Sequence, residues 1–143
     1  MEQDYFADFE QAFVGRSCSI VRESPFWRAD FGSGLTIGLN VPWRIVADGR
    51  VAFGDEDDGQ WFGLSSPVDG EERSDSLLQG RVVQALQLDH ETGDLRIVFN
   101  GKTRIDVFNQ SCGYEGWAAY YSVGSSRWGV IAMGGGEMAV VPG

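Results

Sequence analysis

The chain has few of the side chains on which most enzymatic catalysis depends. It contains one histidine, two cysteines and one lysine among 143 residues. The histidine, His90, stands in Asp89-His90-Glu91-Thr92-Gly93, a pattern typical of an exposed turn, whereas a catalytic triad needs its histidine in a pocket. No Gly-x-Ser-x-Gly elbow occurs, and a histidine-based zinc site would need ligands that the chain lacks. We therefore expect a protein that is not an enzyme and needs neither a cofactor nor a metal.

Long apolar runs and basic targeting sequences are missing as well. No stretch approaches the ~18 consecutive apolar residues of a membrane span. The start, Met1-Glu2-Gln3-Asp4, has no basic region followed by an apolar one. Cys18 and Cys112 show no spacing of a redox pair or a metal site. These absences favour a cytoplasmic protein with reduced thiols.

Positive charge is scarce, and the negative charge is concentrated. The chain has 21 acidic and 11 basic residues, a net charge of −10. Segment 55–75 holds eight acids against Arg73 alone, which gives it a net charge of −7. Such a surface repels nucleic acid and anionic membranes, so the expected partner is a basic protein. A solvated, flexible connector is the alternative interpretation.

Glycine is abundant, with 20 residues placed mainly at the ends of apolar runs. This distribution is typical of the turns of a β-rich domain. Ahead of these runs, the aromatic residues from Tyr5 to Phe13 follow helical spacing and predict an amphipathic helix that is closed by Gly15.

Two parts of the chain resemble each other, which predicts an internal duplication. Gly15-Arg16 recurs as Gly80-Arg81, and a hairpin around Gly32-Ser33-Gly34 recurs around Asn100-Gly101-Lys102. Asn-Gly by itself favours a two-residue turn, but that register would bring charged residues to the buried face of the second hairpin. The predicted pairs are Phe31–Leu35, Ala29–Ile37 and Trp27–Leu39 in the first hairpin, and Phe99–Thr103, Ile97–Ile105 and Leu95–Val107 in the second.

The predicted fold class is α+β, mostly β, with two repeats of a short helix plus an antiparallel meander packed into one domain, 1–143. The first repeat covers about 3–54 and the second about 74–141, with the acidic connector 55–75 between them. A short helix from Ser74 to Gln79, capped by Ser74, is expected to open the second repeat. The pattern leaves open whether the strands form a sandwich or a single curved sheet.

The order of these motifs resembles a widespread set of small bacterial proteins of unknown function. Besides the Gly-Arg pair and the hairpin, the likeness rests on Tyr114-Glu115-Gly116-Trp117 and Gly134-Gly135-Gly136-Glu137. The resemblance implies no catalytic residue, because its motifs are structural glycines and aromatics. The triple glycine predicts a tight bend between two strands. The small size and acidic balance also resemble the immunity proteins of bacterial toxin systems.

Two functions are compatible with these features. The first is a binding protein, in particular an immunity protein that occludes a basic toxin surface such as a nuclease active site. The residues predicted to bind that partner are Asp55, Glu56, Asp57, Asp58, Trp61, Phe62, Glu71 and Glu72.

The alternative function is a small-molecule binder or enzyme with a cleft between the repeats, where two carboxylates could serve as acid and base. The residues predicted for this cleft are Tyr114, Glu115, Trp117 and Glu137. Homo-oligomerisation through exposed strand edges is a third interpretation.

Overall fold

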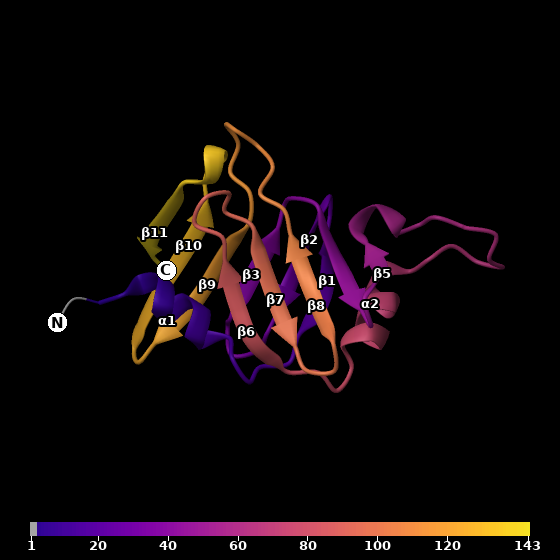
Figure 1. Ribbon diagram of the computed structural model, residues 1–143, viewed down its shortest axis with the longest axis horizontal. Coiled ribbons are helices and arrows are strands. Elements are labelled where there is room, and N and C mark those ends of the chain that lie inside the picture. Colours follow the sequence, from indigo (N-terminus) through magenta and orange to yellow (C-terminus); the bar gives the residue numbers. More distant parts are fainter. Residues whose placement is uncertain (1–2) are drawn as a thin grey trace.

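Two antiparallel sheets lie face to face in the computed structural model, which describes residues 3–143 (Figure 1). The helices are α1 (Tyr5–Ala12) and α2 (Gly70–Leu78), and short 3₁₀ turns occur at η1 (Asp55–Asp57) and η2 (Gly134–Gly136). The strands are β1 (Ser19–Glu23), β2 (Phe26–Asp30), β3 (Thr36–Leu39), β4 (Trp43–Ala47), β5 (Arg50–Gly54), β6 (Val83–Leu88), β7 (Leu95–Phe99), β8 (Thr103–Val107), β9 (Ala118–Val123), β10 (Ser126–Ala132) and β11 (Met138–Pro142). The fold is therefore mostly β, as expected, and it is a sandwich.

The two halves of the chain exchange strands. The six-stranded sheet has the order β1-β2-β3-β9-β10-β11, and the five-stranded sheet has the order β5-β4-β8-β7-β6. Hairpin β4–β5 thus joins the meander β6–β7–β8, while hairpin β9–β10 joins the meander β1–β2–β3. The helices follow the same scheme, because α1 packs against β6 and β9 whereas α2 packs against β1, β4 and β5. Each sheet therefore contains strands from both halves.

Both predicted hairpin registers are confirmed. β2 and β3 pair Trp27 with Leu39, while Phe31 N–H donates to the carbonyl oxygen of Leu35 at 2.9 Å. β7 and β8 keep Ile97 opposite Ile105. Burial of the apolar rows therefore decides the register, and it outweighs the local preference of Asn-Gly.

Each sheet carries a row of buried side chains that faces the other sheet, because the side chains of a strand alternate between its two faces. No member of either row is more than 2% exposed. The rows are Ile20, Ala29, Ile37, Ala119 and Val130 in the six-stranded sheet, and Leu86, Ile97, Ile105, Ile45 and Phe53 in the five-stranded sheet.

The first predicted helix is confirmed, and the second begins earlier than predicted. The Asp4 side chain accepts a hydrogen bond from Ala7 N–H at 3.0 Å and caps α1. The cap of α2 is Asp69, whose side chain accepts from the N–H groups of Glu71 and Glu72, while Ser74 lies buried inside the helix. The prediction of Ser74 as the cap was wrong because Asp69 offers a carboxylate to the same kind of free N–H groups one turn earlier. The last part of the acidic connector is consequently helical.

Candidate protein-interaction site

One arginine holds much of the acidic connector against the six-stranded sheet. Arg22 on β1 forms ion pairs with Asp58 at 2.6 Å, Asp69 at 3.0 Å and Glu71 at 2.7 Å. Its guanidinium lies 5.2 Å from the centre of the Trp27 ring. Hydrogen bonds from Arg22 are the largest cause that holds the pKa values of Asp58 and Asp69 below their usual range. Asp58 and Glu71, predicted to face a partner, are thus engaged within the protein.

Two further acids of the predicted surface accept hydrogen bonds from the backbone. Asp57 accepts from Gly54 N–H at 2.8 Å, and Asp55 accepts from Trp43 N–H at 3.4 Å. Burial raises the pKa of Asp55. These two carboxylates fix the turn at η1 and the end of β5.

Glu56 and Glu72 are the predicted acids that remain available to a partner. Both are exposed, and within residues 3–143 neither carboxylate has a hydrogen-bond or ion-pair partner. With Arg22 counted beside Arg73, the eight acids of the connector still leave a net charge of −6. The surface is acidic, but fewer of its carboxylates are free than the sequence indicated, because Arg22 engages three of them. Nothing in the sequence links Arg22 to this segment.

Residues 59–68, here called the finger, form a narrow loop that extends from the body between η1 and α2 (Figure 1). Gly59 N–H donates to the Val68 carbonyl oxygen at 2.8 Å, and Val68 N–H donates to that of Gln60 at 2.8 Å. Leu64 N–H donates to the Trp61 carbonyl oxygen at 2.7 Å and closes the tip as a β-turn. The finger is therefore a hydrogen-bonded loop rather than a featureless connector.

The turn at the tip places a bulky residue in a backbone conformation that suits glycine. Phe62 has φ of 44° and Gly63 has φ of 75°, the pattern of a type I′ turn. For a residue other than glycine, the left-handed region costs roughly 1–2 kcal/mol. Asparagine or glycine would fill the first of these positions at lower cost. Phe62 thus occupies a turn position whose backbone conformation is unfavourable for phenylalanine.

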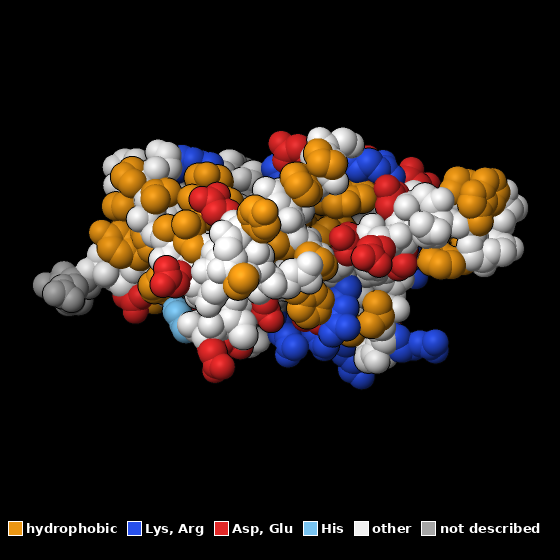
Figure 2. Space-filling view, turned by 90° about the horizontal axis from the view of Figure 1, so that it is seen from above, with side chains coloured by type: hydrophobic (Ala, Val, Ile, Leu, Met, Phe, Trp, Pro, Cys, Tyr) orange, Lys and Arg blue, Asp and Glu red, His pale blue; other side chains and the backbone are white. Residues whose placement is uncertain are grey.

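Three large apolar side chains at this tip face solvent. Trp61 is 57% exposed, Phe62 67% and Leu64 58%. Figure 2 shows apolar side chains at the far end of the projecting segment and acidic side chains where it joins the body. The sequence predicted Trp61 and Phe62 at the site but missed Leu64, whose place at the tip depends on the turn.

The finger is anchored where it returns to the body. Gly70 N–H donates to Asp58 Oδ1 at 2.7 Å. A Cβ atom at Gly70 would lie 2.7 Å from the Trp27 ring and 2.9 Å from the Phe53 ring. This close approach requires glycine, and it joins the base of the finger to the core.

The four residues predicted for a cleft between the repeats do not line one cavity. Trp117 is fully buried in the core and donates its indole N–H to the Gly93 carbonyl oxygen at 2.7 Å. Tyr114 is 82% exposed, and Glu115 and Glu137 are exposed as well. The space between the sheets is filled by core side chains.

The glycines of the two C-terminal motifs serve close backbone packing. η2 forms the predicted tight bend between β10 and β11. A Cβ atom at Gly134 would lie 2.6 Å from the backbone of Gly113, so the two loops can meet only without side chains there. The Asn109 side chain joins them to a third loop by donating to the carbonyl oxygens of Thr92 at 3.0 Å and Met133 at 3.2 Å.

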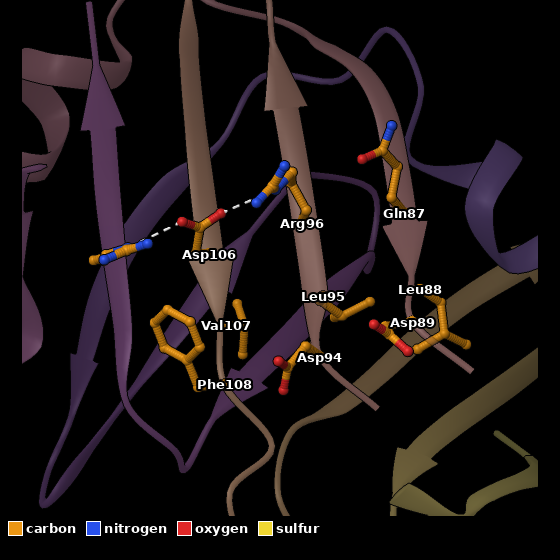
Figure 3. A pocket seen from close by; sticks show the side chains of 10 residues that line it. Gln87, Leu88, Asp89, Asp94, Leu95, Arg96, Asp106, Val107 and Phe108 are labelled. Carbon is orange, nitrogen blue, oxygen red and sulfur yellow. Dashed lines mark hydrogen bonds and ion pairs between the residues drawn. The ribbon is translucent and has the colours of Figure 1, made fainter. Parts of the chain in front are cut away.

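A second charged cluster lies on the outer face of the five-stranded sheet (Figure 3). Asp106 on β8 is almost fully buried and accepts hydrogen bonds from the Nε atoms of Arg44 at 3.0 Å, Arg96 at 3.2 Å and Arg104 at 3.0 Å. Burial opposes ionisation of Asp106, but the hydrogen bonds from Arg104 and Arg44 outweigh it and lower its pKa. Arg44 also lies 5.1 Å from the centre of the Phe108 ring.

Beside this cluster is an open cavity of about 360 Å³ that Arg44, Arg96 and three acids help to line. Figure 3 shows Asp89 and Asp94 at the end of the cavity away from Asp106. Asp94 accepts from Asn109 N–H at 2.7 Å, and Asp89 accepts from backbone N–H groups of the following turn. Each acid therefore already has a structural partner.

Comparisons with protein-family models, with curated proteins and with solved structures found no match to this chain. No helix among residues 3–143 is long and apolar enough to cross a membrane. In the same part of the chain, no group of three or more His, Cys, Asp or Glu side chains is placed to hold a metal ion.

Proposed function

We propose that the protein is a non-enzymatic binding protein that inserts the tip of the finger into an apolar pocket of a partner protein. The observation that carries this proposal is the position of Phe62. Its ring is exposed, and its backbone is in a conformation that costs free energy. A residue that lowers stability without filling the core is best explained by a contact outside the chain.

The tip has the composition of an interface anchor. Trp61 and Phe62 are large aromatic side chains, and burying one apolar side chain of this size contributes about 1.5–3 kcal/mol. Interface hot spots are enriched in tryptophan and in residues that fill a pocket on the partner. The backbone hydrogen bonds of the finger fix the main chain that carries these side chains, which reduces the backbone entropy lost on binding.

The charge around the finger favours a basic partner. Glu56 and Glu72 are exposed near its base, and the connector has a net charge of −6 with Arg22 included. Such a field accelerates association with a positively charged surface and disfavours acidic competitors. The partner we propose is therefore a protein with an apolar pocket and a basic rim. A cytoplasmic bacterial toxin with a basic active site is the specific form that we favour.

The test compares two variants in the capture of partners from the native host. Phe62→Asn removes the ring but suits the turn, so we expect binding to be lost while the melting temperature stays equal or rises. Tyr114→Ser removes an aromatic side chain that is more exposed. It belongs to the loop between β8 and β9, which lies apart from the finger in Figure 1, so this variant should retain every partner. A protein captured by wild type and by Tyr114→Ser but not by Phe62→Asn is the expected result.

If that protein is a toxin, co-expression of the wild type should restore growth of cells that produce it, whereas co-expression of Phe62→Asn should not. A partner that binds Phe62→Asn as strongly as the wild type would exclude the finger as the docking element.

A further inference from the structure

A small pocket on the five-stranded sheet has the features that the finger requires of a partner. It lies on the outer face of β4, β7 and β8, near the turns that join β4 to β5 and β7 to β8. We call this cavity the rim pocket. Its volume is about 200 Å³, and it is lined by Val46, Gly49, Val98, Phe99, Lys102, Thr103 and Arg104.

The register of the sheet builds this pocket. Val46 on β4 and Val98 on β7 both pair with Arg104 on β8. The three positions are neighbours of the buried isoleucine row, so strand alternation turns them to the outer face. Two valines thus provide an apolar floor, and the guanidinium of Arg104 is held beside them by its hydrogen bond to Asp106 at 3.0 Å.

The size of the rim pocket indicates a side chain rather than a metabolite. Sites for small molecules generally enclose ~300–1,000 Å³, and 200 Å³ lies below that range. A single aromatic or branched side chain presented by another protein is a better fit for this volume. The edge strand adds apolar surface there, since Val51, which pairs with Val46, is 59% exposed.

The surroundings of the rim pocket are basic, although the chain as a whole is acidic. Lys102 and Arg104 are among its lining residues, and no acid is. The charge of Arg104 is shared with Asp106, at 3.0 Å. On the side of β7 and β8, which is the lower edge of Figure 2, basic side chains gather in the right half and acidic side chains lie to their left. Arg44 and Arg96 lie farther along the same face, where Asp89, Asp94 and Asp106 line the neighbouring cavity with them.

We propose that the rim pocket of one copy receives the finger tip of a second copy. The two surfaces complement each other in charge and polarity: an apolar tip above an acidic base meets an apolar floor within a basic rim. Within one chain the tip side chains are exposed, so the finger does not occupy the pocket of its own copy. The proposal rests on the finger of the proposed function and names a second binding partner for it, another copy of the same chain.

The contact is heterologous, since one copy contributes the finger and the other contributes the pocket. Such contacts close into rings or continue into chains, according to the rotation between copies. Self-association would cover the exposed tip until a foreign partner with a better pocket displaces it.

Sedimentation velocity on the purified full chain tests this proposal by complementation. The finger variant is Trp61→Ser with Phe62→Asn, and the pocket variant is Val98→Glu with Lys102→Glu. Arg127→Glu on β10 is the charge-matched control for Lys102→Glu, because it lies in the other sheet. Circular dichroism and melting temperature establish that each variant is folded.

We expect the wild type and Arg127→Glu to associate as concentration rises at physiological ionic strength. Each double variant should bind its own copies roughly thirtyfold more weakly, as expected when a hot-spot contact is lost. An equimolar mixture of the two should form a heterodimer and nothing larger, because one intact finger and one intact pocket remain. A monomeric wild type, association that survives in either double variant, or a mixture without heterodimer would each overturn the proposal.

The same variants separate this inference from the proposed function. The pocket variant keeps the finger intact, so it should bind a foreign partner at least as well as the wild type does. The finger variant should lose both interactions. Failure of self-association alone therefore leaves the proposed function standing, whereas loss of partner binding in the pocket variant would contradict the proposed function alone.

Discussion

The two charged clusters of this protein are built in opposite ways. In one, the guanidinium of Arg22 holds the carboxylates of Asp58, Asp69 and Glu71, and in the other the carboxylate of Asp106 holds three guanidinium groups. The central side chain is 35% exposed in the first cluster and 5% exposed in the second.

The difference lies in how the partners are brought together. The Asp106 cluster follows from sheet register, since Arg44 and Arg96 are its direct neighbours on the two adjacent strands. The Arg22 cluster joins β1 to a segment that lies far away in the chain. The Asp106 cluster is thus a property of the sheet itself, while the Arg22 cluster attaches a loop to the sheet. We therefore expect loss of Asp106 to affect the whole fold and loss of Arg22 to affect mainly the finger.

Replacement of Asp106 should have the largest effect. In Asp106→Ala the three arginines lose their shared counter-ion and repel one another, so the free energy of unfolding should fall by about 2–3 kcal/mol. Urea denaturation measures this change. Glu137→Ala, which removes an exposed carboxylate, is the control and should stay within about 0.5 kcal/mol of the wild type. A loss no greater than that of the control would show that the cluster adds nothing to stability.

Arg22→Met should have a smaller global effect and a local one. The ion pairs are partly exposed and screened by solvent, so we expect a loss of about 1 kcal/mol. Amide hydrogen exchange should accelerate at Gly59, Val68 and Gly70, because the base of the finger is released. Arg28→Met, which removes a single surface ion pair with Glu23 at 3.2 Å, is the matched control. Equal acceleration across the sheets would contradict the separation of the two clusters.

The smallest effect concerns pH. The folded pKa of Asp106 is lowered, so its contribution to stability is present above the unfolded pKa of about 3.9 and is lost as pH falls through the folded value. The stability difference between the wild type and Asp106→Asn should therefore be constant near neutral pH and narrow below about pH 4.

The stability difference between the wild type and Arg22→Met should narrow more steeply as pH falls, because Arg22 lowers the pKa values of both Asp58 and Asp69. The free energy of unfolding, measured by tryptophan fluorescence in urea at a series of acidic pH values, gives the curve of stability difference against pH for each variant. Parallel curves would contradict the assignment of one shared carboxylate to the Asp106 cluster and several carboxylates to the Arg22 cluster.

The hairpins were predictable from sequence because their registers depend on short-range alternation. Ile97 and Ile105 can both be buried only if the loop between their strands has three residues. The exchange of strands between halves was not predictable in this way. The pairing of β3 with β9 and of β4 with β8 joins segments far apart in the chain, and alternation on one strand does not identify its distant neighbour.

The candidate site was predictable in its composition and not in its geometry. Trp61 and Phe62 stood out as large apolar residues within an acidic segment. The engagement of Asp58 by Arg22 depends on docking of the connector against β1, and sequence spacing does not encode that contact. Trp117 was predicted to line a cleft between the repeats, whereas its size and apolar character made it a core residue.

The exchange of strands has a consequence for how this protein can change over time. Because β4–β5 and β9–β10 each complete the sheet of the other half, the two halves remain joined by two complete sheets and not only by the covalent link through residues 59–68. That link is therefore free to vary in length and composition without loss of the scaffold. New partners can be acquired by mutation of the segment on which folding depends least.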